Sequence, residues 1–309
     1  MRRLVLTQGD PDGIGPELLL RVASLGGLGA DDRVVAGREH LSRLVATLNV
    51  DWARQGWARI EPRLADDVPP AVSQVAALAR GVDAVLMDSR AALVTAPIDK
   101  AACVAQGFRH PGHTEYLAAR AETDDVAMLL VGPRLRVALA TIHIPLSQVP
   151  RTLDETAIVR AGTHLLAALR QLLGVRRPRI GVLGLNPHAG EQGVLGDDEP
   201  RVIEPAVAEL RRRHGQSAEF LGPLPADAAF PQHAEGRYDG VVAMYHDQGL
   251  APFKLLHVRD GVNLTMGLPF VRTSPDHGTA KDIAGQGVAD PSSMLCAIRL
   301  ARGEAEVWA

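Results

Sequence analysis

The chain has 309 residues, enough for one large domain or two of about 150 residues each. Its 33 Lys and Arg residues against 36 Asp and Glu residues give a net charge of -3, which excludes a protein that binds nucleic acid through a basic surplus. Two cysteines exclude a disulfide framework and a cysteine-based zinc or iron–sulfur site. A transition metal would therefore need imidazole and carboxylate ligands, and the chain has 11 histidines.

No segment approaches the roughly 20 consecutive apolar residues of a membrane-spanning helix. Met1, Arg2 and Arg3 lead directly into a short strand-like run, Leu4–Thr7, with no apolar leader and no cleavage site. The sequence predicts a soluble, cytoplasmic protein.

Short apolar runs alternate with longer helical windows along the chain. The runs predicted as strands are, in order, Arg3–Thr7, Arg33–Ala36, Ala84–Met87, Leu93–Thr95, Ala127–Val131, Val137–Ile144, Arg179–Leu185, Gly240–Tyr245 and Val262–Met266. The windows predicted as helices are Pro16–Ser24, Pro70–Arg80, Thr114–Arg120, Ala157–Leu173, Glu199–His214 and Pro291–Arg302. This alternation predicts an α/β fold with a mainly parallel sheet.

Polar clusters follow several of the predicted strands directly. They are Asp10–Glu17, Pro97–Lys100, His143, Asn186–His188 and His246 with Asp247. Because ligands collect at the carboxyl ends of the strands in open α/β sheets, these clusters are where we expect a site.

Three of the histidines, His143, His188 and His246, each lie just past an apolar strand. Three neutral imidazoles leave coordination positions open for water or substrate, as a catalytic divalent metal requires. The alternative is that they are ordinary hydrogen-bonded histidines, since spacings of this length form no local motif.

A glycine-rich loop, Gly9–Glu17, opens a predicted helix. It lacks the Lys-Ser/Thr of a P-loop and the glycine spacing of a dinucleotide-binding fingerprint. The carboxylates of Asp10, Asp12 and Glu17 suit a metal, a hydroxyl or an amine better than a phosphate. The alternative is a tight strand-to-helix turn in which glycine supplies positive φ.

Three further groups of residues suit an anionic ligand. His113 and Thr114 lie at a predicted helix start, where anions are favoured, although Thr114 could equally cap the helix. Lys254, Asn263 and Arg272 together would grip an oxyanion, and singly they would be solvated surface groups. The polar, glycine-rich segment 276–291 suits close approach to a flat or anionic ligand, or is a plain surface loop.

With these residues in view, the sequence resembles the 4-hydroxythreonine-4-phosphate dehydrogenase family of pyridoxal phosphate biosynthesis. The resemblance covers nearly the whole chain and is carried by GDPDGIGPE, APIDKAA, HPGHTEYLA, the histidine of ATIHIPL, LNPHAGE, YHDQGLAPFK and VNLTMGLPFVRTSPDHGTAKDIAGQG. This family is similar to the isocitrate and isopropylmalate dehydrogenases.

The resemblance implies a two-lobed α/β/α fold with the active site in the cleft between the lobes. Residues 1–112 with 262–309 would form the first, cofactor-side lobe, and residues 113–261 the second lobe, on the metal and dimer side. It also implies a homodimer in which both subunits contribute residues to each active site, with no nucleic-acid or membrane partner.

The resemblance also implies roles for individual residues. The metal ligands would be His143, His188 and His246, for zinc, magnesium or cobalt. The substrate-binding residues would be His113, Thr114, Lys254, Asn263 and Arg272. The segment that would hold NAD or NADP contains His277, Gly278, Thr279 and Asp282. The proton acceptor stays open among Asp247, Lys100, Asp10 and metal-bound water.

The implied reaction is NAD-dependent oxidation of 4-phosphooxy-L-threonine at C3. The resulting β-keto acid loses CO2 to give 3-amino-2-oxopropyl phosphate, and the metal would polarise the C3 oxygen. Three positions depart from the family pattern: Asp12 replaces Ala, Asp99 replaces Asn and Gln192 replaces Gly.

These departures keep other substrates and functions open. A D-threonate or D-erythronate 4-phosphate dehydrogenase is the first alternative. A metal-dependent hydrolase and a binding protein that has lost catalysis are the remote ones. A further relative oxidises an unphosphorylated terephthalate dihydrodiol, and the presence of Lys254, Asn263 and Arg272 disfavours such a substrate.

Overall fold

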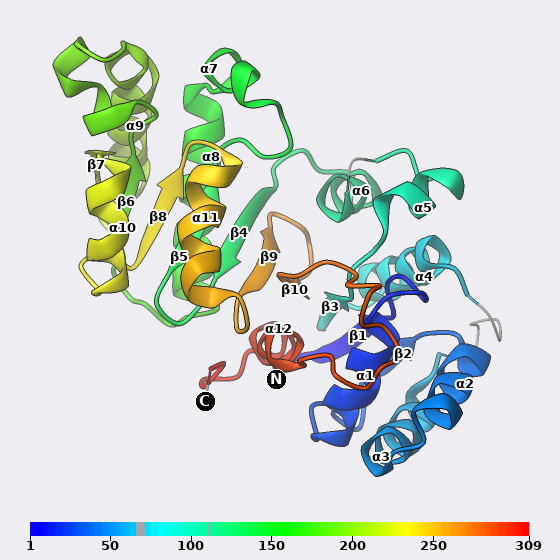
Figure 1. Cartoon of the computed structure of the whole chain (residues 1–309). Helices are drawn as coiled ribbons and strands as arrows, with labels where there is room; N and C mark the ends of the chain where they lie inside the picture. The colour runs from blue at the N-terminus through cyan, green and yellow to red at the C-terminus, as the bar shows by residue number, and fades with distance from the viewer. Residues whose placement is uncertain (66–71, 111, 309) are drawn as a thin grey trace. The chain divides into compact units, whose positions relative to one another are not determined.

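The computed structural model describes residues 1–65, 72–110 and 112–308, and it confirms an α/β fold (Figure 1). The chain divides into two compact units. Unit 1 comprises Met1–Thr123 and Leu268–Ala309, and unit 2 comprises Asp124–Gly267. The chain thus crosses between the units twice, and each unit is described separately below.

The unit boundaries differ from the expected ones at 112/113 and 261/262. Helix α6 (His113–Arg120) belongs to unit 1 because its Tyr116 and Leu117 pack in the hydrophobic core of that unit. Strand β9 (Val262–Met266) belongs to unit 2 because it pairs along its whole length with β4 (Ala127–Val131). As a result, the expected substrate residues His113 and Thr114 lie in unit 1, and Asn263 lies in unit 2.

Within its described residues, unit 1 holds a parallel sheet in the order β2-β1-β3-β10. These strands are β1 (Arg3–Thr7), β2 (Arg33–Val35), β3 (Ala91–Thr95) and β10 (Arg272–Pro275). The helical elements of unit 1 are α1 (Gly15–Ser24), α2 (Arg38–Leu48), α3 (Asp51–Ile60), η1 (Glu61–Arg63), α4 (Gln74–Leu86), α5 (Lys100–Ala105), α6 and α12 (Ser292–Arg302).

The two faces of this sheet are covered by different helices. Val5 and Leu93 share a hydrophobic core with Leu78 and Val82 of α4. Since neighbouring residues in a strand point to opposite faces, Thr273, which pairs in register with Val94, faces the other side, where its hydroxyl donates to the carbonyl of Ala297 in α12 (2.8 Å). The sheet is therefore buried between α4 and α12, as expected for parallel strands.

Unit 2 holds strands in the order β9-β4-β5-β8-β6-β7. The strands not yet given are β5 (Arg136–Leu139), β6 (Arg179–Leu183), β7 (Glu219–Leu224) and β8 (Gly240–Ala243). The helical elements are η2 (Leu146–Gln148), α7 (Val149–Thr152), α8 (Glu155–Gln171), η3 (Pro187–Gly193), the π-helical turn η4 (Glu199–Ile203), α9 (Glu204–His214), α10 (Ala226–Ala234) and α11 (His246–His257).

The sheet of unit 2 is mixed rather than uniformly parallel. Strand β4 runs antiparallel to both β5 and β9, whereas β5, β8, β6 and β7 pair in parallel. Val137 and Val241 share a core with Phe230 of α10 and Phe253 of α11 on one face. Figure 1 shows these two helices together in front of the strands, with α8 behind them.

One predicted strand, Ala84–Met87, is wrong because it is the end of α4. The buried residues Ala77, Leu78, Gly81, Val82 and Val85 recur at helical spacing and carry the helix through Leu86. The predicted helix start at Pro70 lies outside the described residues, and so does Pro111 of the His110–Glu115 motif. The strands β7 and β10 and the helices α2, α3, α5, α7, α10 and α11 lie outside the predicted elements.

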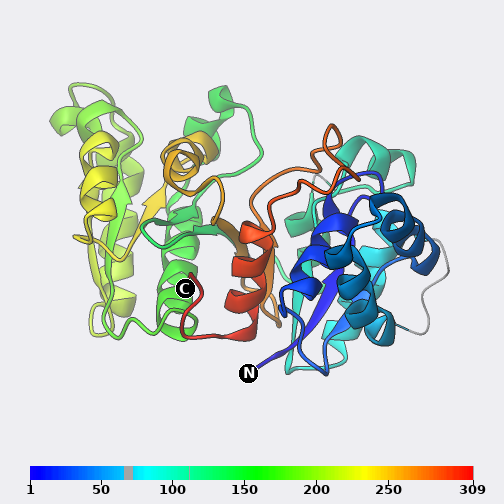
Figure 2. The same ribbon diagram turned by 60° about the horizontal axis from the view of Figure 1, so that its bottom comes forward.

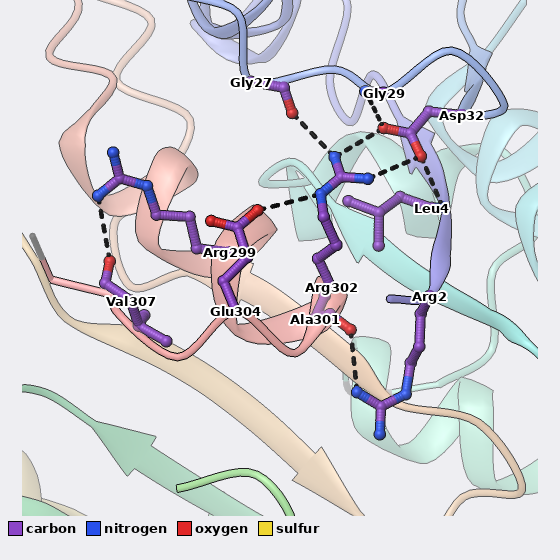
Figure 3. A network of polar contacts seen from close by, with 10 residues as sticks. All are labelled: Arg2, Leu4, Gly27, Gly29, Asp32, Arg299, Ala301, Arg302, Glu304 and Val307. Carbon is purple, nitrogen blue, oxygen red and sulfur yellow. Dashed lines mark hydrogen bonds and ion pairs between the residues drawn. The ribbon is translucent and has the colours of Figure 1, made fainter.

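A buried polar network joins the two ends of unit 1 (Figure 3). Asp32, 3% exposed, accepts the backbone N–H of Leu4 and pairs with the guanidinium of Arg302 at the end of α12 (2.8 Å). The backbone N–H of Arg2 also donates to the carbonyl of Arg302 (3.1 Å). Figure 2 shows the N-terminal end of β1 next to the end of α12, where this network lies.

Both cysteines, Cys103 and Cys296, are free and buried. Burial raises the pKa of the Cys103 thiol to about 11, so this thiol stays protonated at neutral pH. No helix in the described part of the chain is long and apolar enough to cross a membrane.

Candidate active site

Three segments that follow strands of unit 1 meet at the carboxyl edge of its sheet. The backbone N–H of Asp10, after β1, donates to the carbonyl of Pro97, after β3 (2.8 Å). The backbone N–H of Ile14 donates to the carbonyl of Thr279, after β10 (2.9 Å). Two of the polar clusters expected after strands, Asp10–Glu17 and Pro97–Lys100, thus lie together, and the segment after β10, which is not among the predicted strands, joins them.

Lys281 ties these segments to one another through charge. Its ammonium lies 3.0 Å from a carboxylate oxygen of Asp10 and 2.5 Å from one of Asp99. The hydrogen bond from Lys281 is the largest cause that lowers the pKa of Asp99. Asp99 stands where the resemblance to the family implies Asn, and its carboxylate pairs with Lys281. The loop carboxylate Asp10 faces an amine, one of the ligand types that the sequence predicted for it.

The other two carboxylates of the loop Gly9–Glu17 belong to Asp12 and Glu17, and neither pairs with an amine within the described residues. Glu17 is fully buried and accepts the backbone N–H groups of Gly287 (3.1 Å) and Ala289 (2.8 Å). It fixes the far end of the segment 276–291 onto α1. The backbone N–H of Asp12 donates to Asp10 (3.2 Å), as in a tight turn. Glu17 is therefore a structural residue.

His113, Thr114, Arg272 and Lys100 gather at the start of α6, and we refer to these four residues as the His113 cluster. Arg272, 2% exposed, donates to the hydroxyl of Thr95 (2.7 Å). Thr114 is buried inside α6 and does not take the N-cap position, which belongs to Gly112. A Cβ on Gly112 would lie 4.0 Å from Nζ of Lys100, which places Lys100 beside the helix start.

The His113 cluster has the electrostatics of an anion site. Burial first, and then the positive charges of Arg272 and Lys100, lower the pKa of His113 well below its usual range. Nε2 of His113 is buried and has no hydrogen-bond partner within the described residues. Burial lowers the pKa of Arg272 to about 10, and the carboxylate of Glu115 partly offsets that effect. An anion bound here would supply both the negative charge and the missing hydrogen-bond partner.

The remaining predicted substrate residues, Lys254 and Asn263, lie in unit 2. Lys254 is in the last turn of α11, and Asn263 pairs with Leu130 in the register of β9 and β4. Oδ1 of Asn263 is buried and without a hydrogen-bond partner in the described part of the chain. Both His113 and Asn263 thus offer a buried polar atom to a ligand.

Two of the three predicted metal ligands come together in unit 2. His143 follows β5, and His246 is the first residue of α11, directly after β8 (Figure 1). Their imidazole rings lie 5.8 Å apart between centroids. Nδ1 of His246 lies 2.6 Å from a carboxylate oxygen of Asp247, so Asp247 orients this imidazole. A carboxylate on the second ring nitrogen is a usual support for a metal-binding histidine.

The third predicted ligand, His188, is exposed on the turn η3. Across residues 1–65, 72–110 and 112–308, no three His, Cys, Asp or Glu side chains come together in a group that could hold a metal ion. Within this chain, His143 and His246 therefore lie close together, and His188 does not lie with them.

The segment predicted to hold the nicotinamide cofactor follows β10 in unit 1. Gly278 is exposed, and a Cβ on it would meet no heavy atom within 4 Å. Nδ1 of His277 lies 3.0 Å from the carbonyl of Gly278, and the carbonyl of Asp282 accepts the side-chain amide of Gln286 (2.7 Å). Thr279 contacts the first loop through its carbonyl, as described above. Hydrogen bonds thus hold the segment at Thr279 and Asp282, and Gly278 is exposed to solvent.

Sequence reasoning missed two residues that organise these sites, Lys281 and Glu199. Lys281 lies in a segment that had been singled out, and the acidic residue at position 99 was a signal that a cation would be near. Glu199 gave no signal, because a Glu at the start of a helical window is commonplace. It is nevertheless only 1% exposed and contacts the segment that carries His188.

Comparison with known proteins gives a consistent result. A family model described as pyridoxal phosphate biosynthetic protein PdxA matches residues 65–301. The 4-hydroxythreonine-4-phosphate dehydrogenase of Paracoccus denitrificans is 42% identical over 97% of both chains. The crystal structure of the enzyme of that name from Klebsiella pneumoniae is 40% identical, with a TM-score of 0.82 over 98% of both chains.

More distant structures share the fold. A terephthalate 1,2-cis-dihydrodiol dehydrogenase from Burkholderia xenovorans is 29% identical, with a TM-score of 0.66 over 98% of both chains. Isocitrate dehydrogenase from Methylococcus capsulatus is 15% identical, with a TM-score of 0.53 over 99% of this chain and 87% of the other. The latter likeness confirms the expected relation of the fold to the isocitrate dehydrogenases.

Proposed function

Because the chain belongs to the family of the pyridoxal phosphate biosynthetic protein PdxA, we propose that it is a 4-hydroxythreonine-4-phosphate dehydrogenase. It would oxidise 4-phosphooxy-L-threonine at C3 with a nicotinamide cofactor. The β-keto acid formed would lose CO2 and leave 3-amino-2-oxopropyl phosphate.

The observation that carries this proposal is the His113 cluster. The half-buried imidazole of His113, whose pKa is lowered by burial and by two neighbouring cations, has a buried Nε2 with no hydrogen-bond partner within the described residues. A phosphate monoester supplies that anion, and the start of α6 adds favourable backbone dipoles. An unphosphorylated diol would bring no negative charge to the positive field of Arg272 and Lys100, which disfavours it as the substrate.

In this proposal the residues of the cluster position the substrate and do not carry out bond cleavage. Arg272, anchored by Thr95, holds one side of the phosphate, and His113 and Thr114 donate to it from the helix start. Lys254 and Asn263 of unit 2 are proposed to contact the same substrate. Positioning of this kind converts binding energy at the phosphate into alignment of the reacting C3–H bond.

We propose that a divalent metal is held by His143, His188 and His246. The donor set fits such an ion: His143 and His246 lie together, and Asp247 orients the His246 ring as a supporting carboxylate. A bound metal supplies Lewis acidity toward the oxygen at C3. Three imidazoles accept zinc, magnesium or cobalt with differing affinity, so metal identity is a question for reconstitution.

The proposed nicotinamide site is the segment containing His277, Gly278, Thr279 and Asp282. The open face at Gly278 fits close approach of a planar ligand, and the contacts to Asp10 and Ile14 hold the segment at the strand ends. The bound cofactor accepts the hydride from C3. No basic cluster in the sequence demands the 2′-phosphate of NADP, so NAD is the proposed cofactor.

We further propose a cytoplasmic homodimer whose subunits jointly supply the three imidazoles. Exposed apolar side chains lie near three predicted functional residues of unit 2 along the chain. Leu146 is 68% exposed close to His143, Val194 is 77% exposed close to His188, and Leu255 is 82% exposed beside Lys254. Apolar groups in such positions are typical of an association surface.

The three predicted proton acceptors differ in their surroundings. Asp247 is bonded to His246, and Asp10 is paired with Lys281, so each already orients a neighbouring group. Lys100 lies at the edge of the His113 cluster and has no ion pair within the described residues. We keep all three as proposed catalytic groups, with Asp247 and Asp10 acting at least in part by orienting their partners.

A substrate panel tests the proposed function. Purified protein is incubated with Zn²⁺, Mg²⁺ or Co²⁺, with NAD or NADP, and with 4-phosphooxy-L-threonine, D-threonate 4-phosphate or D-erythronate 4-phosphate, while NADH or NADPH absorbance is followed. We expect reduction of NAD with 4-phosphooxy-L-threonine in the presence of metal. A preference for one of the sugar-acid phosphates would establish the first alternative. Release of phosphate with no nicotinamide reduction would establish a hydrolase.

A further inference from the structure

The turn that carries His188 has an unusual backbone. His188, Ala189, Gly190, Glu191 and Gln192 all have left-handed conformations, with φ values of 54°, 52°, 76°, 43° and 58°. Only one of the five is glycine, so the other four occupy a region that L-residues rarely adopt. Such a run persists only where surrounding contacts determine it. The exposed imidazole of His188 makes no hydrogen bond within the described residues, so these contacts must come from elsewhere.

Backbone hydrogen bonds such as that from the N–H of Leu195 to the carbonyl of Gly190 (3.1 Å) supply some of them, and Glu199 supplies others. It is 1% exposed at the start of the π-helical turn η4. One carboxylate oxygen accepts the backbone N–H groups of Leu185 (2.8 Å) and Asn186 (2.7 Å), the two residues that lead from β6 into the turn. The other oxygen accepts the side-chain amide of Asn186 (3.0 Å). The carboxylate thus fixes the entry to the turn at three points.

The turn is also shaped to fit this carboxylate. A Cβ on Gly190 would lie 2.4 Å from the second carboxylate oxygen of Glu199. A Cβ on Gly184 would lie 2.7 Å from Cα of Ala189. Glycine at these two positions lets the left-handed residues close over Glu199. The direction in which His188 leaves the turn therefore depends on Glu199 rather than on contacts of the imidazole itself.

We propose that Glu199 is a positioning residue for the metal site: it holds the left-handed turn η3 so that His188 is presented as a ligand. This inference rests on the proposed role of His188 as a metal ligand. It assigns Glu199 no contact with substrate, cofactor or metal. Buried groups that orient metal ligands typically change metal affinity by about 10- to 100-fold when they are removed.

Glu199→Gln tests the proposal because it keeps the size of the side chain but turns one acceptor into a donor facing the amide of Asn186. The control is Glu204→Gln, which makes the same charge change at an exposed residue of the following helix. Full-length proteins are titrated with Co²⁺ alone, and its visible absorbance is followed. We expect about 10- to 100-fold weaker Co²⁺ binding for Glu199→Gln, and wild-type binding for Glu204→Gln.

A second readout separates positioning from general destabilisation. Turnover of Glu199→Gln should be restored by raising the Co²⁺ concentration, because only occupancy of the metal site is impaired. Gly190→Ala provides an independent variant, since it disturbs the same turn while leaving the carboxylate in place, and it should also weaken Co²⁺ binding. Combining Glu199→Gln with His188→Ala should add little to the effect of His188→Ala alone.

The outcomes distinguish this inference from the function on which it rests. If wild-type protein and His188→Ala bind Co²⁺ equally, His188 is not a ligand, and both the metal assignment and this inference are overturned. If His188→Ala loses Co²⁺ binding while folded Glu199→Gln and Gly190→Ala bind like wild type, only the role of Glu199 is overturned. Should Glu199→Gln fail to fold, the affinity of Gly190→Ala decides.

Discussion

In unit 1 three of the predicted functional residues, Asp10, Thr114 and Arg272, are buried, whereas in unit 2 the predicted metal ligands His143 and His188 are exposed and His246 is half-buried. Arg272 and Asp10 are each 2% exposed, and Arg272 is anchored by Thr95. In contrast, the side chain of His246 is 33% exposed and that of Asp247 is 84% exposed. Unit 1 thus contains buried charged groups with fixed partners, and unit 2 presents imidazoles that are accessible to solvent.

This difference indicates how the chain divides its proposed tasks. A phosphate is bound best by donors fixed in advance in a dry setting, because no reorganisation is then needed when the ligand arrives. The free energy of metal binding orders the ligand side chains, so these can be exposed to solvent before the metal binds. The His113 cluster fits the first requirement and the pair of His143 and His246 fits the second.

The largest expected effect comes from removing a ligand in unit 2. His246→Ala should lower the metal-dependent kcat by roughly 10³-fold or more, since several kcal/mol of charge stabilisation are lost with the ion. The fold should be retained because the imidazole is partly exposed. Circular dichroism checks the fold, and NADH formation with and without added metal checks activity. Undiminished turnover in metal-free buffer would refute the assignment.

The second expected effect is on stability and comes from His233, a histidine of unit 2 that is buried, unlike the predicted metal ligands. His233 is 1% exposed, and burial is the main cause that lowers its pKa to about 4. Below pH 6.5 the imidazole of His233 is protonated in the unfolded chain but stays neutral in the folded chain down to about pH 4. The free energy of unfolding therefore falls as the pH drops from about 6.5 to about 4. The loss is roughly 3 kcal/mol, and it levels off once folded His233 is also protonated.

Urea unfolding across this pH range, with His233→Gln for comparison, measures that loss. The variant should be less stable at pH 7, because His233 accepts the backbone N–H of Arg136 (2.8 Å) and its second nitrogen lies 2.8 Å from the carbonyl of Tyr238. Between pH 6.5 and 4 its stability should fall less steeply than that of the wild type. Parallel curves for the two proteins would show that His233 does not titrate as proposed.

The third expected effect concerns the planar guanidinium of Arg272 in unit 1 and its proposed contact with the phosphate of the substrate. Arg272→Lys keeps the positive charge but loses the planar donor group, so it should raise the KM for the phosphorylated substrate by about 10-fold and change kcat less. Arg272→Ala should raise KM further. Steady-state kinetics at saturating NAD and metal provide the test, and a KM equal to that of the wild type in both variants would place the phosphate elsewhere.

The smallest expected effect concerns strain in unit 2. Gln192 has a φ of 58°, at a position where the resemblance to the family implies glycine. Gln192→Gly should stabilise the protein by roughly 0.5 kcal/mol, because relief of the left-handed strain exceeds the extra chain entropy of glycine. The urea midpoint measures this change. A lower midpoint would mean that the turn η3 is not strained at this residue.

Much of this arrangement followed from the order of residues alone. Apolar runs such as Arg3–Thr7 and Leu93–Thr95 predicted strands correctly, and the polar residues after these two runs lie together in the structure. Strand β10 was missed because its Arg272-Thr-Ser-Pro sequence is polar and its arginine is buried by tertiary contacts. Lys281 and Asp99 are 182 positions apart, so their pairing depends on sheet order that no local pattern contains.

The turn of His188 was beyond prediction for a different reason. Its left-handed backbone contradicts the preference of four of its five residues, and the contacts we propose to hold it come from Glu199 in another element. Local propensity fails where the surrounding structure overrides it, and such places are often functional.

The account depends most on the claim that the His113 cluster binds the phosphate of the substrate. An NMR titration of the His113 imidazole, with and without inorganic phosphate, tests this directly. The lowered pKa of His113 results from burial and from the cations Arg272 and Lys100, so a bound anion should raise it and phosphate should bind more tightly as the pH falls. A His113 pKa that phosphate at saturating concentration leaves unchanged would contradict the account.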